Sequence, residues 1–252
     1  MQTIKQIYRK SYLGEDVVVD RVYQNSKWNP THEFVSNPFP AQPLSDRALV
    51  IGNGTSRLDF NLRLVLEHRE GVFHWAPAQS QRKFFTYGCN ALYRDFKTDF
   101  LVITGDDDFI KEVANSGECE ARVVYAPNRA LFDHPAKFNY VPQSPNWNSG
   151  AVAAYLAAFD GHKKVYLMGF DGNDTPNYNY NVYADTNHYP SKSDSVPEDF
   201  WVQSLAVVLS TYPEVEFIRV APTATFRTPE AWKYFLNFRT ISFRDFVTEA
   251  DV

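Results

Sequence analysis

Small, amide and hydroxyl residues follow directly after four apolar runs of the chain. These groups are residues 52–56 (GNGTS), Asn90, residues 104–106 (TGD) and residues 169–171 (GFD). A fifth group, residues 148–150 (NSG), comes directly before an alanine-rich run. Glycines let backbone N–H groups approach a phosphate, and Asn or Asp side chains can bond the edges of a base or a ribose. These residue types point to nucleotide binding.

Two familiar phosphate-binding motifs are excluded by the residues in and after GNGTS. A GxGxxG fingerprint needs a glycine at position 57, where the chain has Arg57, and no GK[ST] follows to make a Walker motif. Two plainer interpretations stay open: residues 52–56 as a tight turn, and residues 148–150 as an ordinary helix N-cap. The coincidence of several such groups favours the nucleotide site more than any one of them does.

His188 is the residue that we expect to act as a base. It lies in TNHY, within residues 172–197, a polar stretch rich in Tyr and Asn that has no helix or strand period. A loop of this length inside a compact domain is usually functional or disordered, and we interpret it as a lid. An imidazole suits proton removal from a hydroxyl near neutral pH. The alternatives are a polar residue on a solvated loop, and an interface loop in place of a lid.

Residues 106–108 (DDD) form a carboxylate cluster at the end of an apolar run. Such a cluster could hold a divalent cation such as Mg²⁺. The alternative that we favour is a helix N-cap, with acidic residues matched to the helix dipole. Asp106 could also contact a ribose. We therefore expect no required metal or cofactor beyond a bound substrate, with Mg²⁺ left open. We also expect His162 to cap the end of the helix before it.

Short apolar runs alternate with helical patterns, and these elements must position the groups above. The expected strands are residues 47–54, 83–90, 99–108, 121–127, 163–172 and 215–222. The expected helices are residues 59–70, 107–117, 148–161, 199–212 and 228–238, with a final segment at 241–252. Continuous apolar strands are typical of buried parallel sheets, and the alternation implies right-handed crossovers. The sequence predicts an α/β fold: a single-domain three-layer α/β/α sandwich with a mostly parallel, Rossmann-like sheet, whose ligand lies beyond the carboxyl ends of the strands.

Residues 1–46 do not fit this alternation. They are rich in Pro, Asn and Ser towards their end, and we expect an irregular N-terminal arm packed on the domain, with a short strand at 17–19. Residues 47–252 then form one nucleotide-binding domain that carries the lid.

Composition restricts the classes of partner. A net charge of -5 argues against nucleic acid. The sequence shows neither the hydrophobic region of a signal peptide nor an apolar run of about 20 residues that could span a membrane. Cys89 and Cys119 then fit buried reduced thiols in a cytoplasmic protein. The aromatic content of 16% is compatible with a homo-oligomer.

Several runs, taken in order, resemble the bacterial sialyltransferases of glycosyltransferase family 42 and the wider group of DUF115-like proteins. The runs are VIGNGTS, YGCNALY, NSGAVAAYLAAFDGHKKVYLMGFDG, NHY and VEFIRVAP, and they fall within residues 47–222. The most specific piece begins at Ser149 and ends at Asp171.

The resemblance implies a variant of the GT-A fold and a transferase that passes a CMP-activated sialic acid, or a related nonulosonic acid, to a hydroxyl acceptor such as a glycan. It implies that His188 is the base and that Tyr178 and Tyr180 steady the leaving phosphate. With the groups above, it gives these nucleotide-binding candidates: Asn53, Gly54, Thr55, Ser56, Asn90, Asp106, Ser149, Gly150, Gly169, Phe170 and Asp171.

Two other functions stay open. Some DUF115-like proteins resemble pterin diphosphokinases, which use ATP and Mg²⁺, and residues 106–108 would then hold the metal. A non-catalytic module would keep the nucleotide-binding core and use the Tyr- and Asn-rich lid to bind a partner.

Overall fold

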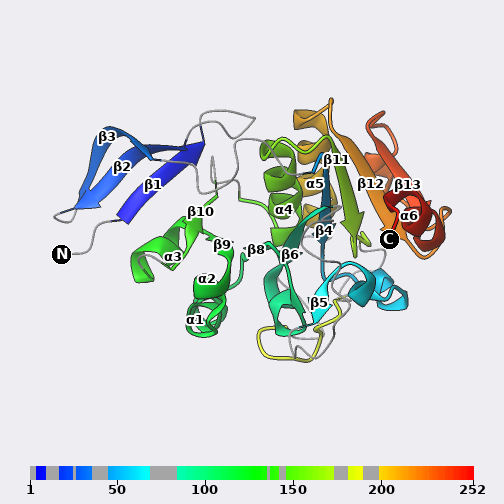
Figure 1. Ribbon diagram of the computed structural model, residues 1–252, viewed down its shortest axis with the longest axis horizontal. Helices are drawn as coiled ribbons and strands as arrows, with labels where there is room; N and C mark the ends of the chain where they lie inside the picture. The colour runs from blue at the N-terminus through cyan, green and yellow to red at the C-terminus, as the bar shows by residue number, and fades with distance from the viewer. Residues whose placement is uncertain are drawn as a thin grey trace.

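The computed structural model describes residues 4–9, 17–24, 27–35, 45–68, 84–134, 137–141, 146–172, 181–189 and 199–252. Within them, eight strands form one sheet in which every neighbouring pair is parallel (Figure 1). Its order is β10-β9-β8-β6-β4-β11-β12-β13. The strands are β4 (Arg47–Ile51), β6 (Phe85–Cys89), β8 (Phe100–Val102), β9 (Val123–Ala126), β10 (Asn139–Tyr140), β11 (Lys164–Met168), β12 (Glu216–Ala221) and β13 (Phe238–Ser242).

The strand order has a switch point at the centre of the sheet. The chain begins at β4, runs outwards through β6, β8, β9 and β10, and returns to β11 on the other side of β4. At such a point the connections from the two strands leave in opposite directions, which opens a crevice at their carboxyl ends. The sheet therefore directs attention to the turns that follow β4 and β11.

Helices cover both faces of the sheet. Ala48 and Val50 of β4 pack with α4 (Ser149–Phe159) and α5 (Phe200–Thr211) in one apolar core. Leu49 and Ile51 of the same strand face the opposite core, with α6 (Phe243–Ala250). On that second face, α1 (Asp107–Asn115) packs against β8 and β9. The alternation of faces along each strand confirms the predicted three-layer α/β, Rossmann-like fold.

The helix α4 lies at the centre of the first face. The Asn148 side chain accepts a hydrogen bond from Ala151 N (3.0 Å), so the helix begins with an N-cap. Nearly all of its side chains are buried, as expected for an apolar helix between a sheet and α5. The helix was predicted from its alanine-rich sequence, and the prediction is confirmed.

The sequence predicts an irregular N-terminal arm, and this prediction is wrong. The arm contains an antiparallel sheet of β1 (Ile4–Arg9), β2 (Val17–Gln24) and β3 (Lys27–Val35). The β-branched run at 17–19 extends into the central strand, and Pro30 lies on the outer one, where a missing N–H is tolerated. The small sheet lies at the β10 end of the main sheet (Figure 1), and β1 contacts β10.

Two predicted helices are wrong. Residues 59–70 contain the last residue of one short 3₁₀ turn, η1 (Thr55–Asp59), and the whole of another, η2 (Leu62–Leu64). They also contain β5 (Glu67–His68), which pairs with β7 (Phe96–Lys97). There the Asn61 side chain accepts from Arg63 N and competes with helix formation. Within residues 228–238 the only helical element is η5 (Glu230–Trp232), and Phe238 begins β13. The buried Trp232 donates to Val202 O (2.9 Å), and the Asn237 amide bonds the end of α5.

The remaining short elements are α2 (Glu118–Ala121), α3 (Asn128–Asp133) and η4 (Asn90–Arg94). His162 does not cap α4 with its side chain: the ring is 2% exposed and contacts Ser45 O and the Tyr87 hydroxyl. Both cysteines are free thiols; Cys89 is buried and Cys119 only half-buried. No helix among the described residues is long and apolar enough to cross a bilayer.

Candidate functional site

The turns after β4 and β11 touch at the switch point. Gly52 N donates to Met168 O (2.8 Å) and Gly54 N donates to Gly169 O (3.0 Å). A Cβ atom on Gly52 would lie 2.7 Å from Gly169 O, and one on Gly169 would lie 2.7 Å from Gly52 O. Gly169 also has a φ of +73°, which favours glycine. These glycines are therefore required by the close approach of two backbones.

The carboxylate of Asp171 occupies the turn that we expected to hold a phosphate. Ser56 N donates to Asp171 Oδ2 (2.9 Å), and the Ser56 hydroxyl donates to the other carboxylate oxygen. The Thr55 hydroxyl also donates to Oδ2 (3.4 Å). The buried Arg219 of β12 holds the Asp171 carbonyl oxygen (2.8 Å). Thr55 and Ser56 thus both donate to Asp171, and the anion at this turn belongs to the protein.

The start of α4 reaches the same edge. Asn148 uses its oxygen for the cap, but its buried Nδ2 has no hydrogen-bond partner in the described structure. The N–H groups of Ser149 and Gly150 lie in the first turn of α4, where a helix offers no acceptor. The Phe170 ring lies between the glycines, 3.4 Å from a Cβ placed on Gly52 and 3.3 Å from one placed on Gly150.

Arg57 is a member of this edge that sequence reasoning missed. Its side chain is 4% exposed, and its Cδ lies 3.2 Å from a Cβ placed on Gly169. Arg57 Nη2 donates to the Tyr183 hydroxyl (3.3 Å), whereas Nε is buried without a hydrogen bond. No carboxylate of the described residues forms an ion pair with it. The only sequence signal was its place directly after GNGTS, where it served to exclude a fingerprint.

We call residues 52–57, 148–150 and 169–171 the switch-point edge. Three of its side chains hold a buried polar atom without a hydrogen-bond partner in the described residues: Asn53 Oδ1, Arg57 Nε and Asn148 Nδ2. Buried polar groups are normally satisfied, so each such atom needs an explanation, and an absent ligand is one. An amide oxygen, a guanidinium N–H and an amide N–H would suit a ligand with both donor and anionic groups.

The described part of the expected lid, residues 181–189, lies across this edge. Asn181 forms a β-bridge with Gly54, and Val182 N donates to Asn53 O (2.8 Å). Tyr183 is buried, and its hydroxyl donates to Asp95 Oδ2 (2.7 Å) while accepting from Arg57. The two tyrosines singled out by the family resemblance, Tyr178 and Tyr180, lie outside the described residues.

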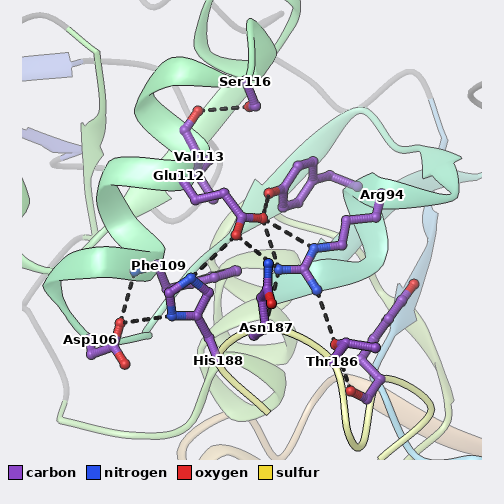
Figure 2. Close-up of polar contacts among 11 residues, drawn as sticks. Arg94, Asp106, Phe109, Glu112, Val113, Ser116, Thr186, Asn187 and His188 are labelled. Atoms are coloured by element: carbon purple, nitrogen blue, oxygen red, sulfur yellow. Dashed lines mark hydrogen bonds and ion pairs between the residues drawn. The ribbon is translucent and has the colours of Figure 1, made fainter.

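His188 lies at the far end of this segment, between two carboxylates (Figure 2). Its Nε2 is 3.3 Å from Glu112 Oε2, and its Nδ1 is 3.5 Å from Asp106 Oδ1. The imidazole is 23% exposed and meets the Phe109 ring edge-on, with centroids 5.7 Å apart. Its φ of +68° is uncommon for a residue other than glycine. The ring is therefore held in place and still reaches solvent.

Glu112, on α1, is the second functional candidate that sequence reasoning missed. Arg94 Nη2 lies 2.8 Å and 3.0 Å from its two oxygens, and the Tyr93 hydroxyl donates to Oε1. Burial alone would raise the pKa of Glu112, but the hydrogen bonds from Tyr93 and Arg94 outweigh it and hold the pKa below its ordinary value. In the sequence, Glu112 was one polar position on a short amphipathic helix.

The residues that follow β6 and β8 connect the switch-point edge with the region around His188. Asn90 has a φ of +45°, and its side chain accepts from Thr104 N (3.0 Å). Asp106 Oδ1 accepts from Phe109 N (2.8 Å), which confirms the N-cap interpretation. Asp107 pairs with Arg129 (2.8 Å). Within the described ranges, no three His, Cys, Asp or Glu residues gather in a way that could hold a metal ion.

The structure thus sorts the predicted site residues into two groups. All but two of the nucleotide candidates lie at the switch-point edge, and Asn90 and Asp106 lie beside it at the next strand ends. His188 joins Arg94, Tyr93, Asp106 and Glu112 in what we call the His188 cluster. Cys89, beside Ser149, is no candidate nucleophile, because burial raises the pKa of its thiol to about 12.

No family model, curated protein or solved structure matches this chain.

Proposed function

We propose that the protein is a glycosyltransferase that binds a CMP-activated acid sugar, a sialic acid or a related nonulosonic acid, and transfers the sugar to a hydroxyl acceptor. The observation that carries this proposal is the set of three buried, unpartnered polar atoms on Asn53, Arg57 and Asn148. All three belong to the turns or the helix start at the topological switch point, where ligands of open α/β sheets bind.

A nucleoside monophosphate group matches those three atoms in chemistry. The guanidinium of Arg57 and the N-terminal turn of α4 both favour a phosphate, and the Asn148 amide adds a neutral donor. Asn53 Oδ1 offers an acceptor for a ribose hydroxyl or a base amino group. Because Asp171 already fills the GNGTS turn, we assign the phosphate to Arg57 and the start of α4 instead.

The His188 cluster lies where the other half of an extended substrate would reach. Asp106 follows β8, and β8 is two strands from β4 in the sheet. At about 4.8 Å per strand, the ends of β4 and β8 are separated by about 10 Å. A nucleotide at the switch-point edge could therefore extend its sugar towards His188.

The proposed reaction is a direct displacement. The acceptor oxygen forms a bond to the anomeric carbon, the bond from that carbon to the phosphate oxygen breaks, and CMP leaves with the electron pair. The acceptor proton passes to the imidazole of His188. Inversion at the anomeric carbon follows from attack opposite the leaving group.

Calorimetry and thermal shift with CMP, CDP, UDP, GDP, ADP and ATP, each with and without Mg²⁺, test the binding step. We expect CMP to raise the unfolding temperature without metal, because a ligand of the native state stabilises it. Stabilisation by ATP and Mg²⁺ alone would favour the diphosphokinase alternative, and no response to any nucleotide would favour the non-catalytic module.

Replacement of the base tests the chemical step. His188→Ala should lower kcat for transfer from CMP-sialic acid by about 10²- to 10⁴-fold and leave the affinity for CMP unchanged. His134→Ala is the matched control, because His134 is the C-cap of α3 and its ring contacts Phe138, which belongs to neither group. Normal transfer by His188→Ala would overturn the assignment of the base.

A further inference from the structure

We propose that Glu112 is a positioning residue that holds His188 in the Nε2–H tautomer, so that Nδ1 is the nitrogen that takes the acceptor proton. This inference deepens the proposed function and rests on it for the role of the proton. It has a structural part, the tautomer, which can be measured without any substrate.

The first argument is the hydrogen-bonding character of Glu112. An ionised carboxylate only accepts hydrogen bonds, and Glu112 Oε2 lies 3.3 Å from His188 Nε2. The pKa of Glu112 is held low by Tyr93 and Arg94, so the group is ionised at neutral pH. The ring nitrogen that faces it must therefore carry the proton for the contact to be favourable.

The second argument is that Glu112 is itself fixed. Arg94 donates to both carboxylate oxygens, from Nε and Nη2, and the Tyr93 hydroxyl donates to Oε1 (Figure 2 shows the Arg94 and His188 contacts). These donors approach mainly Oε1, whereas Oε2 also faces the imidazole. A carboxylate with this many donors cannot turn away from His188 without losing several hydrogen bonds.

The third argument concerns the turn that carries His188. Arg94 Nη1 donates to Thr186 Oγ1 (3.1 Å), and Arg94 Nη2 donates to Asn187 O (3.3 Å). The same guanidinium thus bonds both Glu112 and the two residues before His188. Such mutual constraint is what allows the left-handed backbone at His188 to persist.

The other ring nitrogen is in a looser setting. Asp106 Oδ1, at 3.5 Å from Nδ1, already accepts the N–H of Phe109 at 2.8 Å as the N-cap of α1. The Asp106 side chain is 66% exposed and that of Glu112 only 30%, so Nδ1 faces the more open of the two carboxylates, and we place the approach of an acceptor hydroxyl on this side. The arrangement parallels catalytic triads, where a carboxylate on one imidazole nitrogen sets the tautomer and the other nitrogen acts as the base.

The tautomer is measured by ¹⁵N NMR of the imidazole nitrogens in histidine-labelled protein, with His188→Gln to assign the signals. In the neutral ring of the wild-type protein we expect a protonated Nε2 and an unprotonated Nδ1. Glu112→Gln should weaken this preference, and Glu120→Gln, an exposed glutamate paired with Lys137, should leave it unchanged. A neutral His188 protonated at Nδ1 in the wild-type protein would overturn the inference.

The kinetic part uses the same variants. Glu112→Gln should lower kcat by about 10²-fold with CMP affinity unchanged, and the acid limb of its kcat–pH profile should move to lower pH. Tyr93→Phe, which removes one donor and keeps the carboxylate, should give a smaller loss without moving the limb. A Glu112→Gln profile identical to that of the wild type would contradict a positioning role. Absence of transfer in the wild type, together with the expected tautomer, would overturn the proposed function alone.

Discussion

The switch-point edge and the His188 cluster differ in how their polar groups are satisfied. At the edge, Asn53, Arg57 and Asn148 each keep a buried polar atom without a partner in the described structure. In the cluster, Glu112 is bonded by Tyr93, Arg94 and, across an ion pair, His188. Incomplete bonding is what a binding surface shows before its ligand arrives, whereas complete bonding fixes groups for chemistry. The contrast supports the proposed division, with recognition in one region and catalysis in the other.

The largest effect should come from Gly169→Ala, which disturbs the backbone contact between the turns after β4 and β11 at the switch-point edge. The added Cβ would lie 2.7 Å from Gly52 O at a φ of +73°, so we expect a loss of about 2–4 kcal/mol in the free energy of unfolding. Urea titration measures it. Gly117→Ala is the control: it has a φ of +82° with open space around it, and should lose only about 1 kcal/mol. Equal losses would mean that the contact between the turns is unimportant.

Replacement of Arg57 should separate stability from recognition. Because a buried cation without a counterion is costly, Arg57→Met should raise the unfolding temperature of the free protein. It should weaken CMP binding by about 10- to 100-fold, since a charge-assisted hydrogen bond is lost. Thermal unfolding and calorimetry give the two numbers. A variant that is destabilised and binds CMP normally would make Arg57 a structural residue.

Asn148→Asp should change recognition with less effect on the fold. The aspartate keeps the N-cap of α4 and suits the helix dipole, so the unfolding temperature should not fall. The unpartnered Nδ2 donor becomes an anionic oxygen, and we expect CMP affinity to drop by about 10-fold. Asn148→Ser, a cap without that charge, is the companion variant and should bind more tightly than the aspartate. The opposite order would argue against an anion at this helix start.

The smallest effect should appear in the acid stability of the cluster. Folding lowers the pKa of Glu112, so the stability that it contributes is present above the ordinary pKa of about 4.3 and is lost as the pH falls through the lower, folded value. The unfolding temperature of Glu112→Gln should therefore lie below that of the wild type at pH 7 and approach it at pH 3. A difference that is independent of pH would show that the carboxylate charge is not what stabilises this region.

The parallel sheet could be predicted because each strand is recognisable from its own residues. Each is a short apolar run with neighbours on both faces, and α4 adds an alanine-rich helix with an Asn cap. The arm was misread because Pro30 and the polar residues beside it hide β3, which pairs with the directly preceding strand β2. The predicted helix at 59–70 failed because Phe60 and Leu62 are both buried although they are only two residues apart, a spacing that puts side chains on opposite sides of a regular helix.

The candidate site could be predicted only where the residue type itself is typical of a binding or catalytic site. Glycines and asparagines at strand ends marked the edge, and a histidine in a polar stretch marked the cluster. Arg57 and Glu112 could not be found in this way, because an arginine after a turn and a glutamate on a helix are ordinary in sequence. Their significance comes from burial in one case and from three converging donors in the other.

Residues 181–189 join the two regions through one short piece of backbone. One end is attached to Asn53 and Gly54, and the other end carries His188 and is held by Arg94. On the proposed function, a nucleotide at the first attachment and an acceptor at the second would be coupled through this backbone, and thermodynamic reciprocity makes the coupling equal in both directions. Each of the two proposed ligands would then raise the affinity for the other by the same factor, whichever of them binds first.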